Sequence, residues 1–242
     1  MSEVTPVPPC PRCAATHVIR GGRSRSGKPT FRCRGCGRRF VADPAKGPIS
    51  AERQAPVRRL PGERVSLRGI ARVTGLSRAW LQRFVNDLYR EATPWEPGPL
   101  KKKSGGLIRE ADEMRSFVGN KRSQWWIWAA PDAGTRQVVA VVAGDRSEKT
   151  ARDLGDALPP EYRAAAAVRT DFWAAYAAVV PQPPHRAGGK GAGITGHVER
   201  FWCTVRQRCS RYVRKALSFS KCFVNHVGAL WYFIRAYNAS RL

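Results

Sequence analysis

The chain has 242 residues and a formal net charge of +25 at pH 7, because 43 lysines and arginines oppose 18 aspartates and glutamates. This length can bury a full hydrophobic core, and a pI near 10.9 favours a polyanionic partner such as nucleic acid over an ordinary metabolic role. The sequence has no apolar run of the roughly 20 residues needed to span a bilayer and no secretory signal. We therefore expect no membrane contact and a cytoplasmic, nucleoid-associated protein whose seven cysteines stay reduced.

Four of the cysteines form two Cys-x-x-Cys pairs near the N-terminus, separated by nineteen residues: Cys10, Cys13, Cys33 and Cys36. This spacing is typical of four thiolates that hold a tetrahedral zinc ion. We predict a small zinc ribbon over residues 1–45, rich in arginines that can contact DNA. A zinc fold that only staples the N-terminus, or that holds a protein partner, is the alternative. The remaining cysteines lack ligand spacing and are predicted to pack as small hydrophobic residues: Cys203, Cys209 and Cys222.

A stretch rich in proline, alanine and arginine, residues 43–61, predicts a linker. Beyond it, residues 65–88 have the apolar spacing of two helices, with Gly75 at the turn between them and Ser77 able to cap the second helix. We therefore place a helix-turn-helix DNA-binding region in residues 46–92. Its second helix would present three side chains to base edges or phosphates: Arg78, Gln82 and Arg83. A helical hairpin without DNA contact gives similar spacing and is the alternative.

A second linker, residues 93–106, is dense in proline and glycine and includes a lysine run. From residue 107 onward the pattern predicts three strands, a helix, a fourth strand, a helix and a long basic helix. The predicted strands are 107–118, 125–130, 137–143 and 165–170, and the predicted helices are 148–158, one near 172–179, and one that carries Glu199, Arg200, Arg206, Arg208, Arg211, Arg214 and Lys215.

The last 81 residues, from Tyr162 to Leu242, contain thirteen lysines and arginines but only two acidic residues, Asp171 and Glu199. A surface that binds polyanions is weakened by each carboxylate, so carboxylates kept there indicate chemistry or structure. Asp171 ends a predicted strand, where ligand sites form in open mixed sheets, and a helix-borne carboxylate such as Glu199 can join such a site. The alternatives are that Asp171 caps the next helix and that Glu199 pairs with a neighbouring arginine.

Three strands, a helix, a fourth strand with an aspartate and a later helix with a glutamate match the ribonuclease-H-like layout of polynucleotidyl transferases. The segments 110–119, 170–176 and 197–211 resemble transposases of the insertion-sequence-one family, as do 217–221 and 237–240. The resemblance extends to the zinc module and the helix-turn-helix. We therefore expect an α+β multidomain protein: a zinc ribbon, a helix-turn-helix, and a ribonuclease-H-like α/β catalytic domain (residues 107–242) with a mixed five-stranded sheet.

The resemblance implies an Asp-Asp-Glu recombinase in which three carboxylates bind two magnesium ions: Asp112, Asp171 and Glu199. It implies that Arg206, two turns after Glu199 on the same helix face, contacts transposon-end DNA, and we assign Arg200 the same role. The implied partners are terminal inverted repeats and target DNA, with a homo-oligomer formed on the DNA because two ends are processed together. The sequence departs from the family pattern at Arg115, where tryptophan is common, and at Trp202, where asparagine is common.

The leading hypothesis is a DNA transposase that cleaves 3′ ends and joins them to a target. The alternatives are a DNA-binding regulator without chemistry, a degraded transposase copy, and a nuclease that hydrolyses without joining. Any one of Glu110, Asp112 and Glu113 could instead be a solvated strand residue; strand alternation places Glu110 on the face of Asp112 and Glu113 on the opposite face. His197 is predicted to line the start of its helix, and orientation of a metal-bound water is the alternative.

Overall fold

A computed structural model describes residues 6–42, 44, 47–93, 95–101, 106–165, 167–171, 185–188, 193–213 and 220–242. Its contacts divide the chain into two compact units, Met1–Ser50 and Ala51–Leu242. The division into four segments that the sequence predicts stays a prediction. Within the second unit, the N-terminal helices pack against the C-terminal helix, which also contacts the larger sheet.

The first unit is a three-stranded antiparallel sheet in the order β1-β2-β3. Its strands are β1 (Val18–Arg23), β2 (Pro29–Cys33) and β3 (Arg39–Val41). The buried core is small and includes two of the paired cysteines: Cys10, Val18, Phe31 and Cys33. Because so few apolar side chains are buried, a module of this size needs a further stabilising element such as a metal ion.

The second unit begins with a helical region: α1 (Ala51–Arg59), the 3-10 turn η1 (Leu60–Gly62), α2 (Leu67–Thr74) and α3 (Arg78–Glu91). The two helices predicted on either side of Gly75 are confirmed as α2 and α3. Gly75 has φ of +64°, which a glycine adopts without steric cost. The Ser77 hydroxyl accepts a hydrogen bond from the amide of Trp80, so it caps α3 as predicted.

Helix α1 corrects the prediction of a linker over residues 43–61. The segment contains Pro56, which lacks an amide proton, and this argued against a helix. The helix forms because its Val57 side chain is fully buried against the rest of the unit. Tertiary packing of an apolar residue therefore outweighs the local cost of the proline.

The larger sheet has the strand order β6-β5-β4-β7-β8, and its strands are β4 (Ile108–Phe117), β5 (Gln124–Pro131), β6 (Val138–Gly144), β7 (Ala167–Thr170) and β8 (His185–Ala187). Strands β4, β5 and β6 are antiparallel neighbours, whereas β7 runs parallel to both β4 and β8. The positions predicted for the first four strands are confirmed. In the β4–β7 register Ala111 lies opposite Thr170, and this pairing sets the place of the residues that follow each strand.

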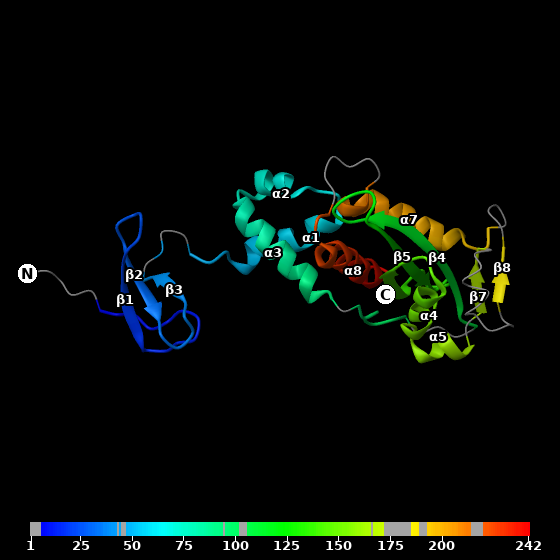
Figure 1. Cartoon of the computed structure of the whole chain (residues 1–242), viewed down its shortest axis with the longest axis horizontal. Helices are drawn as coiled ribbons and strands as arrows, with labels where there is room; N and C mark the ends of the chain where they lie inside the picture. The colour runs from blue at the N-terminus through cyan, green and yellow to red at the C-terminus, as the bar shows by residue number, and fades with distance from the viewer. Residues whose placement is uncertain are drawn as a thin grey trace, which may run out of the picture. The chain divides into compact units, whose positions relative to one another are not determined.

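Helices cover both faces of this sheet (Figure 1); they are α4 (Glu148–Asp156), α5 (Pro160–Ala165), α7 (Gly196–Arg208) and α8 (Phe223–Ala239). Ala111 packs in a core cluster with Leu154 of α4 and Tyr162 of α5. Its neighbour Glu110 instead bonds the first turn of α7. Because successive strand residues point to opposite faces, α4 and α7 lie on opposite sides of β4. Among the described helices, none has the length and apolar character needed to cross a membrane.

The long basic helix is shorter than predicted. Helix α7 ends at Arg208, because Cys209 has an extended backbone and is buried. Arg211 lies in the separate 3-10 turn η2 (Ser210–Tyr212). Arg214 and Lys215, and the helix predicted near 172–179, lie outside the described residues.

Helix α8 joins the helical region to the sheet. Its Gly228 approaches α3 so closely that an added Cβ would lie 2.4 Å from the carbonyl oxygen of Tyr89, which leaves no room for a side chain. At its other end Asn238 is buried; its Oδ1 accepts from the Val138 amide and its Nδ2 donates to the Val138 carbonyl, each at 2.9 Å. The Asn238 amide thus satisfies the edge of β6 as a neighbouring strand would.

A buried polar network links α8 to β4. His226, which is 1% exposed, places Nε2 2.8 Å from the Ser116 hydroxyl and Nδ1 2.9 Å from the Ser220 hydroxyl. Arg211 donates to the same Ser220 hydroxyl at 3.2 Å. Burial, and then the positive charge of Arg211, lower the pKa of His226 to about 4. The folded protein therefore holds this imidazole neutral.

We predict an acid-sensitive contribution to stability from His226. Its pKa is lower in the folded chain than the ordinary value of about 6.5, so the unfolded chain binds the proton first and the stabilisation is lost as the pH falls from about 6.5 toward about 4. Between about pH 7 and pH 5 the free energy of unfolding should fall by about 2 kcal/mol more in the wild type than in His226→Gln. Urea unfolding at the two pH values measures this difference.

The matched control is His17→Gln, because His17 is exposed in the first unit. It should keep the wild-type pH dependence. An equal pH dependence in His226→Gln and the wild type would contradict the prediction.

Candidate active site and zinc site

The four paired cysteines come together at one end of the first unit. The Sγ atoms of Cys10 and Cys36 lie 3.6 Å apart, as do those of Cys13 and Cys33, and all four lie within 4.8 Å of one another. Zinc–sulfur bonds of about 2.3 Å in a tetrahedron place sulfurs about 3.8 Å apart. The four thiols therefore fit the predicted zinc ion.

Backbone amides support thiolates at this site. The amide of Arg12 points to Cys10 Sγ at 3.5 Å, and the amide of Cys36 points to Cys33 Sγ at 3.4 Å. Burial by itself raises the pKa of Cys10, but the hydrogen bonds from Arg12 and from neighbouring cysteines outweigh burial and lower that pKa to about 6. A backbone hydrogen bond from Ala15 lowers the pKa of Cys13, but side-chain hydrogen bonds with Cys36, Cys10 and Cys33 outweigh it and raise that pKa to about 12. The neighbouring thiols thus share their protons, and zinc binding would release these protons.

The prediction for the other three cysteines is confirmed for Cys209, which is buried, and is wrong for Cys203 and Cys222, which are exposed. Cys203 lies on α7, whose buried residues recur at helical intervals: Val198, Phe201, Trp202 and Val205. This periodicity turns Cys203 toward solvent.

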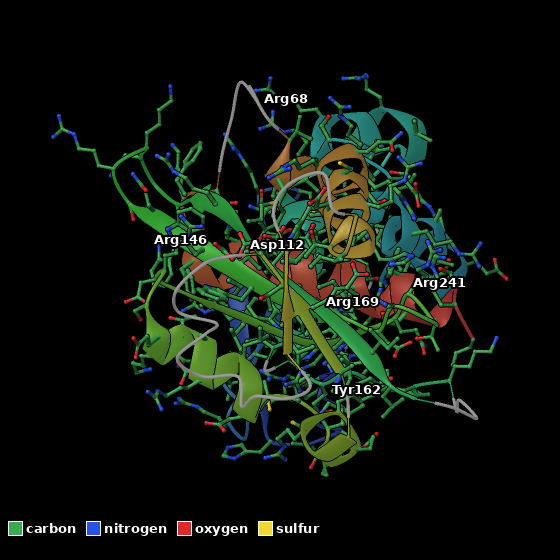
Figure 2. All side chains as sticks on the ribbon, turned by 90° about the vertical axis from the view of Figure 1, so that its right-hand side faces the viewer. Arg68, Asp112, Arg146, Tyr162, Arg169 and Arg241 are labelled. Carbon is green, nitrogen blue, oxygen red and sulfur yellow. The ribbon has the colours of Figure 1, made fainter. Side chains whose placement is uncertain are left out.

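The sheet register brings two of the predicted carboxylates together. Because Ala111 of β4 lies opposite Thr170 of β7 in a parallel pair, the next residues, Asp112 and Asp171, are also side by side. Carboxylate oxygens of Asp112, Asp171 and Glu113 all lie within 4.8 Å of one another. Figure 2 shows Asp112 at this place on β4, with Arg169 on the neighbouring β7.

Glu113 reaches this cluster although it belongs to the other face of β4. Its side chain is 1% exposed, and its Oε1 accepts hydrogen bonds from Arg146 Nε at 2.7 Å and Nη2 at 2.6 Å. Arg146 in turn stacks over the ring of Trp126 at 4.7 Å. Glu113 is thus neutralised by a guanidinium, which argues against a role as a metal ligand.

Glu199 stands in the first turn of α7. It is exposed, and its Oε1 accepts a hydrogen bond from the Thr195 hydroxyl at 3.0 Å. The group of oxygens within 4.8 Å, as found among the described residues, does not include Glu199. Its charge nevertheless acts on the site, because burial and the nearby charges of Glu113, Asp171 and Glu199 raise the pKa of Asp112 to about 7.

The raised pKa of Asp112 comes first from burial and then from the neighbouring carboxylates. Burial and like charge both disfavour ionised Asp112, and a divalent cation would relieve both. Carboxylate oxygens are the ligands that magnesium prefers. The residues present therefore fit a hard divalent cation between the middle of β4 and the end of β7.

Sequence reasoning missed the function of Glu110. Alternation placed it on the face of Asp112, but gave no sign that its carboxylate is fully buried and holds the start of α7. His197 lines the start of that helix as predicted, and its Nδ1 lies 2.7 Å from Glu110 Oε1.

The residues predicted to contact DNA lie on two helices. The side chains of Arg78, Gln82 and Arg83 are exposed on α3, and Gln82 Nε2 donates to Asn86 Oδ1 at 2.9 Å. On α7, Arg200 is exposed and Arg206 is half-buried. A groove runs beside the start of α3, and its lining includes Arg68, Arg78, Gln82 and Arg211.

Two family models match the chain. Residues 106–238 match the model described as IS1 transposase, and residues 5–37 match the model described as the InsA N-terminal domain, a zinc ribbon. The two matches fall on the larger sheet and on the four-cysteine module. They define the class of protein: a transposase of the DDE type that carries an N-terminal zinc ribbon.

Curated relatives agree with these models. The chain is 35% identical over 128 residues to the insertion element iso-IS1n protein InsB of Shigella dysenteriae, which covers 53% of this chain and 94% of that protein. It is 32% identical over 120 residues to the insertion element IS1 protein InsB of Shigella sonnei (50% and 88%) and to the IS1 4 protein InsB of Escherichia coli strain K12 (50% and 69%). The chain belongs to the IS1 transposase family and is a DNA transposase.

We predict that zinc removal unfolds the first unit alone. A strong chelator, or Cys13→Ser, should release the metal and abolish the ordered structure of residues 6–42, because the small core cannot replace four metal bonds. The second unit has its own core and should stay folded. Zinc analysis of the purified chain and limited proteolysis with mass spectrometry follow both results. Cys203→Ser, an exposed cysteine outside the cluster, is the control; a protease-resistant first unit after zinc loss would contradict the prediction.

Proposed function

We propose that this transposase binds terminal inverted repeats and catalyses metal-dependent 3′-end cleavage and strand transfer, with Asp112, Asp171 and Glu199 as its catalytic carboxylates. The observation that carries the proposal is the β4–β7 register, which sets Asp112 beside Asp171 with oxygens within 4.8 Å. Glu199 completes the set from α7 and contributes to the raised pKa of Asp112. One carboxylate within a central strand, one at the end of the neighbouring parallel strand and one on a helix suit a polynucleotidyl transferase site.

Two magnesium ions, held by these three carboxylates, would activate the attacking oxygen and stabilise the leaving oxygen of the DNA phosphate. The protein residues around the site have separate tasks. Arg146 holds Glu113 and so leaves Asp112 and Asp171 as the ligands on the two strands. Thr195 restrains the orientation of the Glu199 carboxylate through its hydrogen bond.

DNA recognition is assigned to α3 and to basic residues of α7. Arg78, Gln82 and Arg83 are exposed near the start of α3, where a helix-turn-helix contacts base edges. The adjoining groove adds Arg68 and Arg211, which suit contact with phosphates. We assign Arg200 and Arg206 of α7 to the DNA next to the site, because they share a helix with Glu199. The arginine-rich zinc ribbon would add contacts that position the DNA without reading its sequence.

A regulator without chemistry is not favoured, because the family match covers the carboxylate-bearing domain. The two residues that depart from the family pattern bear on whether the chain is a degraded transposase copy. Arg115 is exposed on β4, and Trp202 is buried on α7 with its ring 4.9 Å from that of Phe201. Both positions are compatible with an intact Asp112, Asp171 and Glu199. A nuclease would share this site and differ in failing to join DNA ends.

The transposase would process two ends together, so we propose that it assembles as a homo-oligomer on DNA. Its partners are the inverted repeats and a target duplex. A strongly basic chain is expected to stay associated with the nucleoid in the cytoplasm.

The carboxylate assignment predicts loss of chemistry without loss of binding. Asp112→Asn, Asp171→Asn and Glu199→Gln should each lower metal-dependent 3′-end cleavage by about 10³-fold or more, because several kcal/mol of charge stabilisation are lost. The assay combines purified protein, magnesium and a duplex that carries the inverted repeats flanking the reading frame, and it scores both cleavage and joining.

The control variants are Asp153→Asn and Glu148→Gln, whose side chains are exposed on α4. They should keep wild-type activity. Cleavage without joining would support the nuclease, and wild-type cleavage by Glu199→Gln would refute the assignment. Repeat binding without cleavage in magnesium or manganese would indicate a degraded copy or a regulator, and reversion of Arg115 and Trp202 would then be tested.

The recognition assignment predicts separate effects on affinity and on salt dependence. Arg78→Ala and Arg83→Ala should each weaken repeat binding by about 1–3 kcal/mol where the arginine contacts a base, or lower the salt slope by about one where it contacts a phosphate. Fluorescence anisotropy at several salt concentrations measures both. Arg90→Ala, on the last turn of the same helix and paired with Asp87, is the control. Equal losses in all three variants would point to general charge instead of recognition by α3.

A further inference from the structure

Helix α7, which carries Glu199, is capped by a residue from another part of the chain. The first amides of a helix need hydrogen-bond acceptors, and a side chain at the N-cap usually supplies one. Thr195 stands at the N-cap of α7, yet its hydroxyl bonds no amide of that first turn. Glu110 of β4 supplies the cap instead: its Oε2 accepts from the amides of His197 at 2.8 Å and Val198 at 3.0 Å.

The other oxygen of Glu110 completes the attachment. Oε1 lies 2.7 Å from His197 Nδ1 and 4.0 Å from Arg169 Nη1 on β7. The carboxylate is 0% exposed, so both oxygens bond protein groups in a site screened from water. Hydrogen bonds to an ionised carboxylate in such surroundings are strong and directional. Glu110 therefore fixes the start of α7 to β4 and faces β7 as well.

This attachment acts directly on the carboxylate site. Glu110 and Asp112 are two residues apart and share a face of β4. Glu199 follows Val198, which Glu110 bonds, and its carboxylate is turned by the Thr195 hydroxyl at 3.0 Å. Thr195 is free for this contact because Glu110 provides the cap. The pair thus controls where Glu199 stands relative to Asp112.

We infer that Glu110 and Thr195 are positioning residues that set the separation of Asp112 and Glu199, and with it the affinity of the site for divalent metal. The inference rests on the proposed function of those two carboxylates. Glu110 is not itself a ligand, because its oxygens are engaged with α7 and buried. Groups that orient metal ligands change metal affinity or activity by about 10- to 100-fold when they are removed.

The test measures metal binding apart from catalysis. Mn²⁺ is titrated into the zinc-loaded, DNA-free full chain and followed by electron paramagnetic resonance. The metal concentration for half-maximal 3′-end cleavage is measured in parallel. The variants are Glu110→Gln, which keeps one carbonyl acceptor, and Thr195→Val, which removes the hydroxyl at nearly constant shape. We expect each to weaken Mn²⁺ binding by about 10-fold or more and to raise the metal requirement, with repeat binding unchanged.

Two controls separate positioning from stability. Thr195→Ser keeps the hydroxyl and should restore wild-type metal affinity. Val139→Ala removes buried volume from β6, away from α7, and should lower the melting temperature while it leaves Mn²⁺ affinity unchanged. If Glu110→Gln fails to fold, Thr195→Val and Thr195→Ser still decide the question.

Two outcomes would overturn the inference: wild-type Mn²⁺ affinity in both Glu110→Gln and Thr195→Val, or an equal loss of affinity in Val139→Ala. Glu199→Gln serves as the reference for both outcomes. If this variant weakens metal binding and cleavage, the carboxylate site is correctly assigned, and either outcome then refutes the positioning role of Glu110 and Thr195. If Glu199→Gln leaves both unchanged, the proposed function itself fails.

Discussion

The buried carboxylate of Glu110 is the contact on which the arrangement of the candidate active site depends. It joins the central strand β4 to the first turn of α7, and these two elements carry Asp112 and Glu199. A buried carboxylate without hydrogen-bond partners would destabilise the folded chain. Glu110 therefore favours the one placement of α7 on β4 in which the helix amides reach its carboxylate. Parallel pairing of β4 with β7 then adds Asp171 to the same edge. The helix cap and the sheet register thus build one site from three distant segments.

Helix α7 is held at both ends, and its other end contacts the segment just before α2. At the last turn, the side chain of Arg208 forms an ion pair with Glu63. The backbone carbonyl oxygen of Arg208 accepts a hydrogen bond at 2.6 Å from the amide of Arg64, and both partner residues lie just before α2. Helix α8 makes a second connection, through the close approach of Gly228 to α3 and through Asn238 on β6. Helices α2 and α3 therefore belong to the same compact unit as the larger sheet.

The chain combines a strongly positive net charge with a local cluster of carboxylates, and the two have different roles. The net charge of +25 attracts DNA over a wide surface. The edge of the sheet instead concentrates carboxylates, so that burial and neighbouring negative charges raise the pKa of Asp112. Nearby cations are committed elsewhere: Arg146 binds Glu113, and Arg169 faces Glu110. A divalent cation bound to these carboxylates would offset their negative charge and allow the negatively charged DNA phosphate to approach them.

The sequence by itself determined what depends on short-range patterns. Cysteine spacing located the zinc site, apolar periodicity located α2, α3 and the strands, and motif resemblance identified the transposase family. Tertiary structure alone decided the partners of Glu110 and Glu113, the helix at residues 51–59, the end of α7 and the exposure of Cys203. Glu110 and His197 are 87 residues apart, and Val57 is helical because a distant core buries it. Local patterns encode periodicity and turn geometry, but a contact between distant segments exists only once the sheet has formed.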